Sequence, residues 1–299
     1  MSARRLELPV TAELAGIKVD TLLKRHLHLS GTVVRRVKWL PDGILVDGVR
    51  VNTRFCPKEG QVLSVRLSDP ERRSGIVPAP GPLDIVWEDE DLLVLNKAPG
   101  VPVHPGPGHF DDTICNFLLN YYDSRGIEGD AHPVHRLDRG TSGLLVVAKH
   151  PHAQEVLKNQ LHTSEFRRIY LAVCLGGPAD ERGTVDAPIG MAEGSIVARA
   201  VRPDGLPAQT HYRVLERRGT VPWCGWSWRR GGPTRSGSIW PIWAVPWRGL
   251  LYGTEDRDLI PRPALHSSEL AVRQPVTGER LTFTCPLPAD MARLMKPET

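Results

Sequence analysis

The 299-residue chain has no long apolar run, no closely spaced pair of cysteines and no strong excess of charge of one sign. Its apolar stretches are far shorter than the roughly 20 residues that span a bilayer. Its first residues, MSARRLELPV, lack the apolar core of a signal peptide. We therefore expect a soluble, cytoplasmic protein without membrane contact.

The five cysteines are scattered and include no C-x-x-C pair, which argues against a disulfide framework and against a structural zinc site. His104 and His109 have no set of Asp, Glu or Cys partners at ligand spacing. We expect these histidines to be structural loop residues, and the sequence predicts no metal site.

The net charge of +4 is small but unevenly distributed. Residues 1–70 carry twelve Lys or Arg and seven Asp or Glu, whereas the remaining 229 residues are close to neutral. A small basic module beside a near-neutral body suits an attachment that binds a polyanion.

The basic segment has the pattern of a compact α+β module. Apolar residues predict one helix over 19–27 and a second over 33–38, Asp47-Gly48 predicts a hairpin turn, and 60–67 alternates as a strand. With LS after the first helix, DGVRVN in the hairpin and GQVLSV in the strand, the segment resembles the S4 RNA-binding module. The resemblance implies phosphate contacts from Lys24, Arg25, Arg35, Arg36 and Lys38. The alternative is a generic small domain with a solvated basic helix.

A Pro- and Gly-rich stretch, PERRSGIVPAPGP, divides the chain. We predict a domain over 1–69, a linker over 70–82 and a second domain over 83–299.

The second domain is organised around HPVHRLDRGTSGLLVVAKH, residues 132–150. Leu144–Ala148 predicts a buried strand, so Asp138 lies on the loop that leads into it. Because Arg136 and Arg139 flank Asp138, we expect its carboxylate to be ionised and able to act as a nucleophile or base. A surface ion pair at a turn is the plainer alternative. The motif offers no second carboxylate for glycoside hydrolysis.

HRLDRGTSGLLVVAK closely resembles the catalytic motif of the RluA/RluD-type RNA pseudouridine synthases, and VLNKAPGVPVHPGPGH resembles their first motif. The resemblance implies an α+β protein whose second domain has a mixed, mainly antiparallel central sheet. It implies that uridine in structured RNA is isomerised to pseudouridine without a cofactor. Ribosomal RNA is the favoured substrate, with transfer RNA as the alternative, and a monomer is expected.

The same resemblance assigns roles within the site. Asp138 would be catalytic, and Tyr170, in a segment resembling the K-x-Y motif, would stack on the extruded base. Arg136 would fill space in the RNA beside that base, with His135 and Arg139 also binding substrate. A buried strand tyrosine is the ordinary interpretation of Tyr170 in the absence of this resemblance.

One stretch does not fit the family pattern. Residues 219–250 hold six of the eight tryptophans and no acidic residue, and they show neither a helical nor a strand period. Since tryptophan has the single codon TGG, a shifted frame turns each one into Leu, Val or Met. In that frame 231–249 is compatible with GRTHQIRVHLAHLGCPVAG, which resembles the third motif of the family. The visible pattern resumes after 250 with LYG and PALHSSEL.

We therefore hypothesise that 221–249 are out of frame, with a genuine Trp-rich insertion as the rival. In the family, the arginine of HQIRVH pairs with the catalytic aspartate, and this chain has Gly237 at that place. The alternative function is therefore a catalytically impaired RNA-binding protein.

Overall fold

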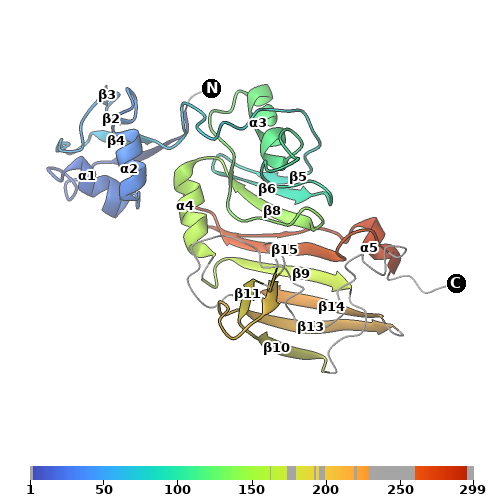
Figure 1. Ribbon diagram of the computed structural model, residues 1–299. Helices are drawn as coiled ribbons and strands as arrows, with labels where there is room; N and C mark the ends of the chain where they lie inside the picture. Colours follow the sequence, from blue (N-terminus) through green and yellow to red (C-terminus); the bar gives the residue numbers. More distant parts are fainter. Residues whose placement is uncertain are drawn as a thin grey trace.

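The computed structural model describes residues 3–161, 163–173, 180–191, 193–194, 199–218, 221–228 and 260–294 (Figure 1). It contains a four-stranded sheet near the N-terminus, a ten-stranded sheet that forms the body, and a two-stranded ribbon. Within the body sheet β15 and β8 pair in parallel, and the other described pairs are antiparallel. The prediction of an α+β protein with a mixed, mainly antiparallel sheet is confirmed.

The N-terminal unit has the strand order β1-β4-β2-β3. Its elements are β1 (Arg5–Pro9), α1 (Val19–Thr21), the π-helix η1 (Leu22–His26), α2 (Gly31–Val37), β2 (Ile44–Val46), β3 (Val49–Arg50) and β4 (Val62–Arg66). Ser30 begins α2, because its hydroxyl accepts a hydrogen bond from the backbone N–H of Val33 at 3.2 Å. Asp47 and Gly48 both have positive φ, as the predicted hairpin turn requires. The sequence prediction missed β1, which pairs with β4.

The body sheet has the order β10-β13-β14-β9-β15-β8-β6-β5, with β16 on β15 and β7 on β8. Its strands are β5 (Ile85–Glu88), β6 (Leu92–Lys97), β7 (His132–Pro133), β8 (Ser142–Ala148), β9 (Arg167–Val173), β10 (Arg182–Asp186), β13 (Gln209–Arg218), β14 (Val221–Trp228), β15 (Leu265–Arg273) and β16 (Arg280–Thr284). The ribbon is β11 (Ile189–Met191) with β12 (Arg199–Val201), and the helices are α3 (Ile114–Arg125), α4 (Pro151–Gln160) and α5 (Ala289–Leu294).

Strand β8 is buried along its whole length because helices cover both faces of the sheet (Figure 1). Leu145 and Val147 join an apolar cluster with α3 on one face, while Leu144 and Val146 join a second cluster with α4 on the other. An uninterrupted apolar run is typical of a strand covered on both sides. The predicted buried strand is therefore confirmed.

Part of the Trp-rich stretch lies in the sheet, although its sequence shows no strand period. The backbone of β14 pairs with β13 on one side and β9 on the other. Main-chain hydrogen bonds build such a ladder whatever the side-chain pattern. Strand β14 thus covers 221–228 of this stretch, and residues 229–249 of the frame hypothesis lie outside the described residues.

The segment 70–82 contains no helix or strand, but it is held against the body. The Arg72 guanidinium pairs with Asp123, and Asp130 accepts hydrogen bonds from the Ser74 hydroxyl and backbone N–H. The Asn116 side chain donates to the carbonyl of Val77 at 2.7 Å. The predicted linker is thus a strap across α3 and its neighbours, and the boundaries at 69 and 82 stay predictions.

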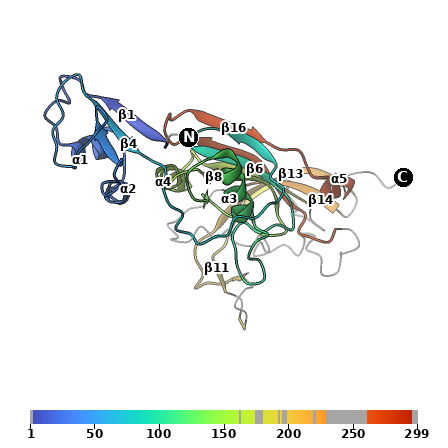
Figure 2. The ribbon, with the colours of Figure 1, turned by 90° about the horizontal axis from the view of Figure 1, so that it is seen from above.

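A buried carboxylate joins the two units. Asp91, at the start of β6, accepts hydrogen bonds from Arg4 of the N-terminal unit, from His150 and from Gln274. The basic unit projects to one side of the body sheet from this junction (Figure 2). Within the ranges described, no helix is long and apolar enough to cross a membrane.

Candidate active site

Asp138 lies on the turn between β7 and β8, as the sequence predicts. The backbone N–H of Thr141 donates to the carbonyl of Asp138 at 3.0 Å, which closes the turn. The backbone N–H of Gly100 donates to the carbonyl of Arg139 at 2.8 Å. The loop that carries Asp138 is therefore joined to the first-motif loop by main-chain contact.

A buried lysine reinforces this junction. Lys97, at the end of β6, is 1% exposed, and its ammonium group donates to the carbonyls of Ala98, Val101 and Arg139 at 2.9, 2.9 and 3.2 Å. Burial lowers the pKa of Lys97 to about 7, against the opposing attraction of the Asp138 carboxylate. One cation thus holds both loops and lies within electrostatic reach of the candidate catalytic group.

A second buried cation holds the next residue of the loop. Arg262 pairs with Asp290 of α5 at 2.6 Å and donates to the carbonyl of Gly140 at 3.2 Å. Gly140 packs so closely on Pro263 that an added Cβ would lie 2.7 Å from the proline ring. The backbone following Asp138 is therefore fixed from two sides.

The electrostatic environment of Asp138 differs from the sequence expectation. Partial desolvation raises the pKa of the Asp138 carboxyl, and the nearby charges of Arg136 and Lys97 oppose that rise without cancelling it. The expectation that flanking arginines alone set its ionisation was incomplete, because it ignored the atoms that displace water. Asp138 is nonetheless exposed at the surface, so its carboxyl group is open to an incoming nucleoside.

The two flanking arginines have different surroundings. Arg136 is exposed, and its positive charge acts to lower the pKa of both Asp138 and His104. Arg139 directs its Nε to the carbonyl of Gly100 at 3.0 Å, so its side chain braces the loop. Arg136 is therefore placed to meet RNA, whereas Arg139 has a structural contact as well.

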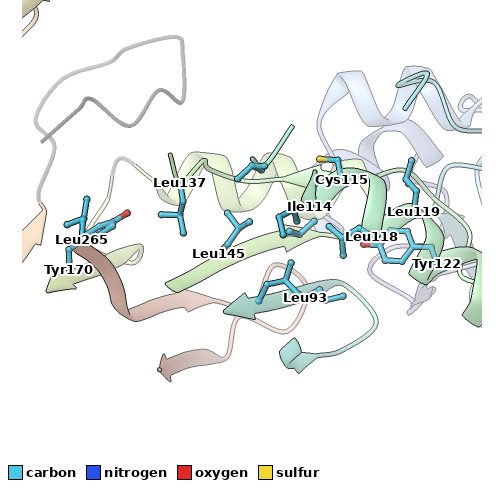
Figure 3. Close-up of a cluster of buried hydrophobic side chains, with 14 of the residues drawn as sticks. Leu93, Ile114, Cys115, Leu118, Leu119, Tyr122, Leu137, Leu145, Tyr170 and Leu265 are labelled. Atoms are coloured by element: carbon cyan, nitrogen blue, oxygen red, sulfur yellow. The ribbon is translucent and has the colours of Figure 1, made fainter. Parts of the chain in front are cut away.

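Tyr170 lies on β9 at the end of the apolar cluster nearest Leu137 and Leu265, away from the α3 residues (Figure 3). It is 3% exposed, and its negatively charged neighbour Asp138 acts on it electrostatically. Burial raises the pKa of the Tyr170 phenol. The structure thus brings Tyr170 of β9 near the loop that carries Arg136 and Asp138, two separate parts of the sequence.

His135 is placed differently from the prediction. It is 3% exposed, its Nε2 accepts from the backbone N–H of Val146, and its ring meets Phe166 edge-on at 5.6 Å between centroids. Burial holds the pKa of His135 well below its ordinary value, which keeps the ring neutral. Its ring is thus neutral and packed against Phe166 in the core, and its predicted contact with RNA stays a prediction.

The five basic residues of the N-terminal unit that are predicted to bind RNA differ in exposure and in their contacts. Lys24, Arg25 and Arg35 are exposed, and Lys38 lies over the ring of Trp39, which is 75% exposed. Arg36 instead pairs with the buried carboxylate of Asp69 at 2.7 Å. Its charge is committed to a contact inside the protein, so the prediction of an RNA-binding role for Arg36 is not supported.

Sequence reasoning missed Lys97, Arg262 and the hydroxyl of Ser267. The burial of Lys97 could have been predicted, because Lys97 directly follows the apolar run LLVLN and so lies at the end of a buried strand. Nothing in the sequence alone distinguishes Arg262 or Ser267 from surface residues. In the described ranges, no group of three or more His, Cys, Asp or Glu is arranged to hold a metal ion.

Comparison with known proteins decides the family. The model for RNA pseudouridylate synthase matches residues 91–246, more than half of the chain. The chain belongs to the RNA pseudouridylate synthase family. It is an enzyme that isomerises uridine to pseudouridine in RNA, which confirms the prediction made from the motifs.

Relatives of this synthase support the assignment. RNA pseudouridine synthase YjbO of Bacillus subtilis (strain 168) is 35% identical over 274 residues, covering 91% of this chain and 96% of the relative. Ribosomal large subunit pseudouridine synthase D of Nitrosomonas europaea is 34% identical over 305 residues, covering 97% and 87%. The structure of human RNA Pseudouridylate Synthase Domain Containing 4 shares the fold, with a TM-score of 0.50, 21% identity and coverage of 70% and 90%.

Proposed function

We propose that Asp138 is the catalytic carboxylate of this synthase and that Tyr170 contacts the target base. The observation that carries the proposal is the immobilised loop of Asp138. Lys97 and Arg262 bind the carbonyls of the two residues that follow Asp138, and the carboxyl they position is partly desolvated. An exposed carboxylate on an immobilised loop can be presented to a nucleoside in a fixed position, which is what attack on that nucleoside requires.

The chemistry needs few groups because the reaction is an isomerisation. The N1–C1′ bond breaks, the uracil rotates, and a C5–C1′ bond forms. The proton leaves C5 and N1 gains one, so no atom is added and no redox partner is required. Asp138 serves as nucleophile or base during bond exchange. Stacking on Tyr170 then holds the extruded base, a contact worth about 1–3 kcal/mol.

The N-terminal unit supplies affinity and register on the RNA. Its order of two helical segments, hairpin and strand supports the S4-like interpretation. The exposed cations Arg25 and Arg35 suit phosphate contacts, as do the half-buried Lys38 and the exposed Lys24, whose ammonium also pairs with Asp20 at 2.7 Å. Arg36 is left out of this set because Asp69 neutralises it.

The substrate is proposed to be ribosomal RNA. The support is that relatives from Nitrosomonas europaea and Escherichia coli O157:H7 bear the name ribosomal large subunit pseudouridine synthase D. A cytoplasmic monomer acting on structured RNA, without a cofactor, is the form in which we expect the synthase to work.

The alternative is that the chain as written binds RNA but turns over poorly. Its basis is Gly237, which stands where the family's third motif has the arginine that pairs with the catalytic aspartate. Sequencing the gene across 219–252 tests the frame hypothesis, and a confirmed reading frame would end it. If the frame is shifted, the protein with GRTHQIRVHLAHLGCPVAG at 231–249 should exceed the chain as written in activity.

The experiment that tests the proposed site is Asp138→Ala in both readings of 231–249. Pseudouridine formation on ribosomal RNA should disappear, while binding to the same RNA is retained. Binding without turnover in the unsubstituted chain as well supports the alternative. Full activity of the Asp138→Ala protein would refute the catalytic assignment.

A further inference from the structure

Two buried hydroxyl groups, those of Ser267 and Tyr170, lie beside the candidate active site. Ser267 of β15 is 0% exposed and Tyr170 is 3% exposed, and neither hydroxyl has a hydrogen-bond partner of good geometry among the described residues. The two residues face each other in the β15–β9 ladder. Leaving one such group unsatisfied is unfavourable, so two together call for an explanation.

The backbone around Ser267 leaves it little freedom. Gly143, five residues after Asp138, has φ of 107° and pairs with Ser267 across the parallel β8–β15 contact. A Cβ on Gly143 would lie 2.2 Å from the carbonyl oxygen of Ser267. The strand that follows the catalytic turn therefore fixes the backbone of Ser267 next to Tyr170.

The neighbouring serine shows that burial alone does not leave a hydroxyl unsatisfied. Ser268 directs its hydroxyl to the carbonyl of Ile169 at 3.2 Å. Ser267 instead pairs with Tyr170 across the ladder, so the two side chains share one side of the sheet. Burial raises the pKa of the Tyr170 phenol, and the charge of Arg168 and the Ser267 hydroxyl both oppose that rise.

We propose that Ser267 is a positioning residue for Tyr170, holding the phenol ring in the orientation that stacks on the target base and directing its hydroxyl toward the polar groups of the same nucleotide. This inference rests on the proposed function, because it takes Tyr170 to contact the base. In the free protein the two hydroxyls are left without full hydrogen bonding. Substrate binding completes the set: Ser267 donates to the Tyr170 oxygen, and the Tyr170 hydroxyl is free to donate to a polar group of the bound nucleotide.

The test uses Ser267→Ala, Tyr170→Phe and their double variant in the full chain, with Ser268→Ala as the matched control. Ser267→Ala should lower kcat/KM about threefold to tenfold, the loss expected for one neutral hydrogen bond. In the Tyr170→Phe background it should have no further effect, since it acts through the missing hydroxyl. Ser268→Ala should leave kcat/KM unchanged.

Melting temperature separates this role from a structural one. Removing a hydroxyl that lacks a partner should leave the Tm of Ser267→Ala equal to or above that of the parent, whereas Ser268→Ala, which loses a made hydrogen bond, should melt lower. This comparison applies to the chain as written and to the frame-restored chain alike.

The outcomes distinguish the two levels of the argument. Activity in Asp138→Ala would overturn the proposed function itself. An inactive Asp138→Ala with a fully active Ser267→Ala would overturn only the role of Ser267. A lowered Tm for Ser267→Ala would likewise overturn that role. So would an equal loss of kcat/KM when Ser267→Ala is introduced into the parent chain and into Tyr170→Phe.

Discussion

Lys97 gives a quantitative prediction because its charge is buried without a carboxylate in direct contact. The protein lowers the pKa of Lys97 from an ordinary 10.5 to about 7, chiefly by burial. This difference corresponds to about 5 kcal/mol by which the folded state disfavours the charged amine. Lys97→Met removes that titration and leaves the rest of the chain unchanged.

The sign of the pH effect follows from proton binding. Between pH 7 and 10.5 the unfolded state holds the Lys97 proton and the folded state releases it, so the stability of the wild type rises with pH in this window. The methionine variant lacks this gain. The free energy of unfolding of the wild type should therefore rise relative to Lys97→Met by about 2 kcal/mol from pH 7 to pH 9.

Urea unfolding followed by circular dichroism at pH 7, 8 and 9 measures this difference. Groups shared by both proteins cancel in the comparison. Lys149→Met serves as the control, since Lys149 pairs with Glu88 at 2.8 Å, and this variant should simply be less stable. A difference between wild type and Lys97→Met that stays constant over the pH range would refute the reasoning.

Three further predictions concern the base, the RNA and the junction. Tyr170→Phe should keep RNA affinity but lower the single-turnover rate constant up to about tenfold, because stacking remains and one hydrogen bond is lost; an unchanged rate constant would contradict its role. Arg35→Ala should weaken RNA binding and flatten its salt dependence in filter binding, whereas Arg36→Ala should instead lower Tm, since it leaves the buried Asp69 unpaired. Asp91→Asn should destabilise the protein by about 3–5 kcal/mol in urea unfolding, most clearly at neutral pH, and a neutral effect would contradict the junction described above.

The pH limits on the Asp91 prediction follow from its hydrogen bonds. Burial alone would raise the pKa of Asp91, but donors from His150, Arg4 and Gln274 outweigh it and hold the pKa well below the ordinary value. Its contribution is therefore present above the ordinary carboxyl pKa and is lost as pH falls toward the folded value.

The elements of the fold that the sequence predicted are those with strong local signals. Asp47-Gly48 demanded a hairpin turn, and the run Leu144–Ala148 could be stable only as a covered strand. The sequence prediction missed β1 because Arg5–Pro9 is short and half exposed. Its place in the sheet depends on pairing with β4, more than 50 residues later. Pairing at such separation leaves no local pattern to read.

The site was predictable in its residue types but not in its physical environment. Asp138 and Tyr170 carry family motifs, so resemblance found them. The burial of His135 and the neutralisation of Arg36 depend on Phe166 and Asp69, which come near only after folding. Charge in the sequence therefore overestimated how many cations are free to meet RNA.

The most direct test of the central claim measures tritium release from RNA labelled at uridine C5, since the new glycosidic bond replaces the C5–H bond. With Asp138→Asn, which keeps the shape and removes the charge, we predict no release above background, while RNA binding and Tm match those of the parent or exceed them. Tritium release by Asp138→Asn at the parental rate would contradict the assignment of Asp138 as the catalytic group.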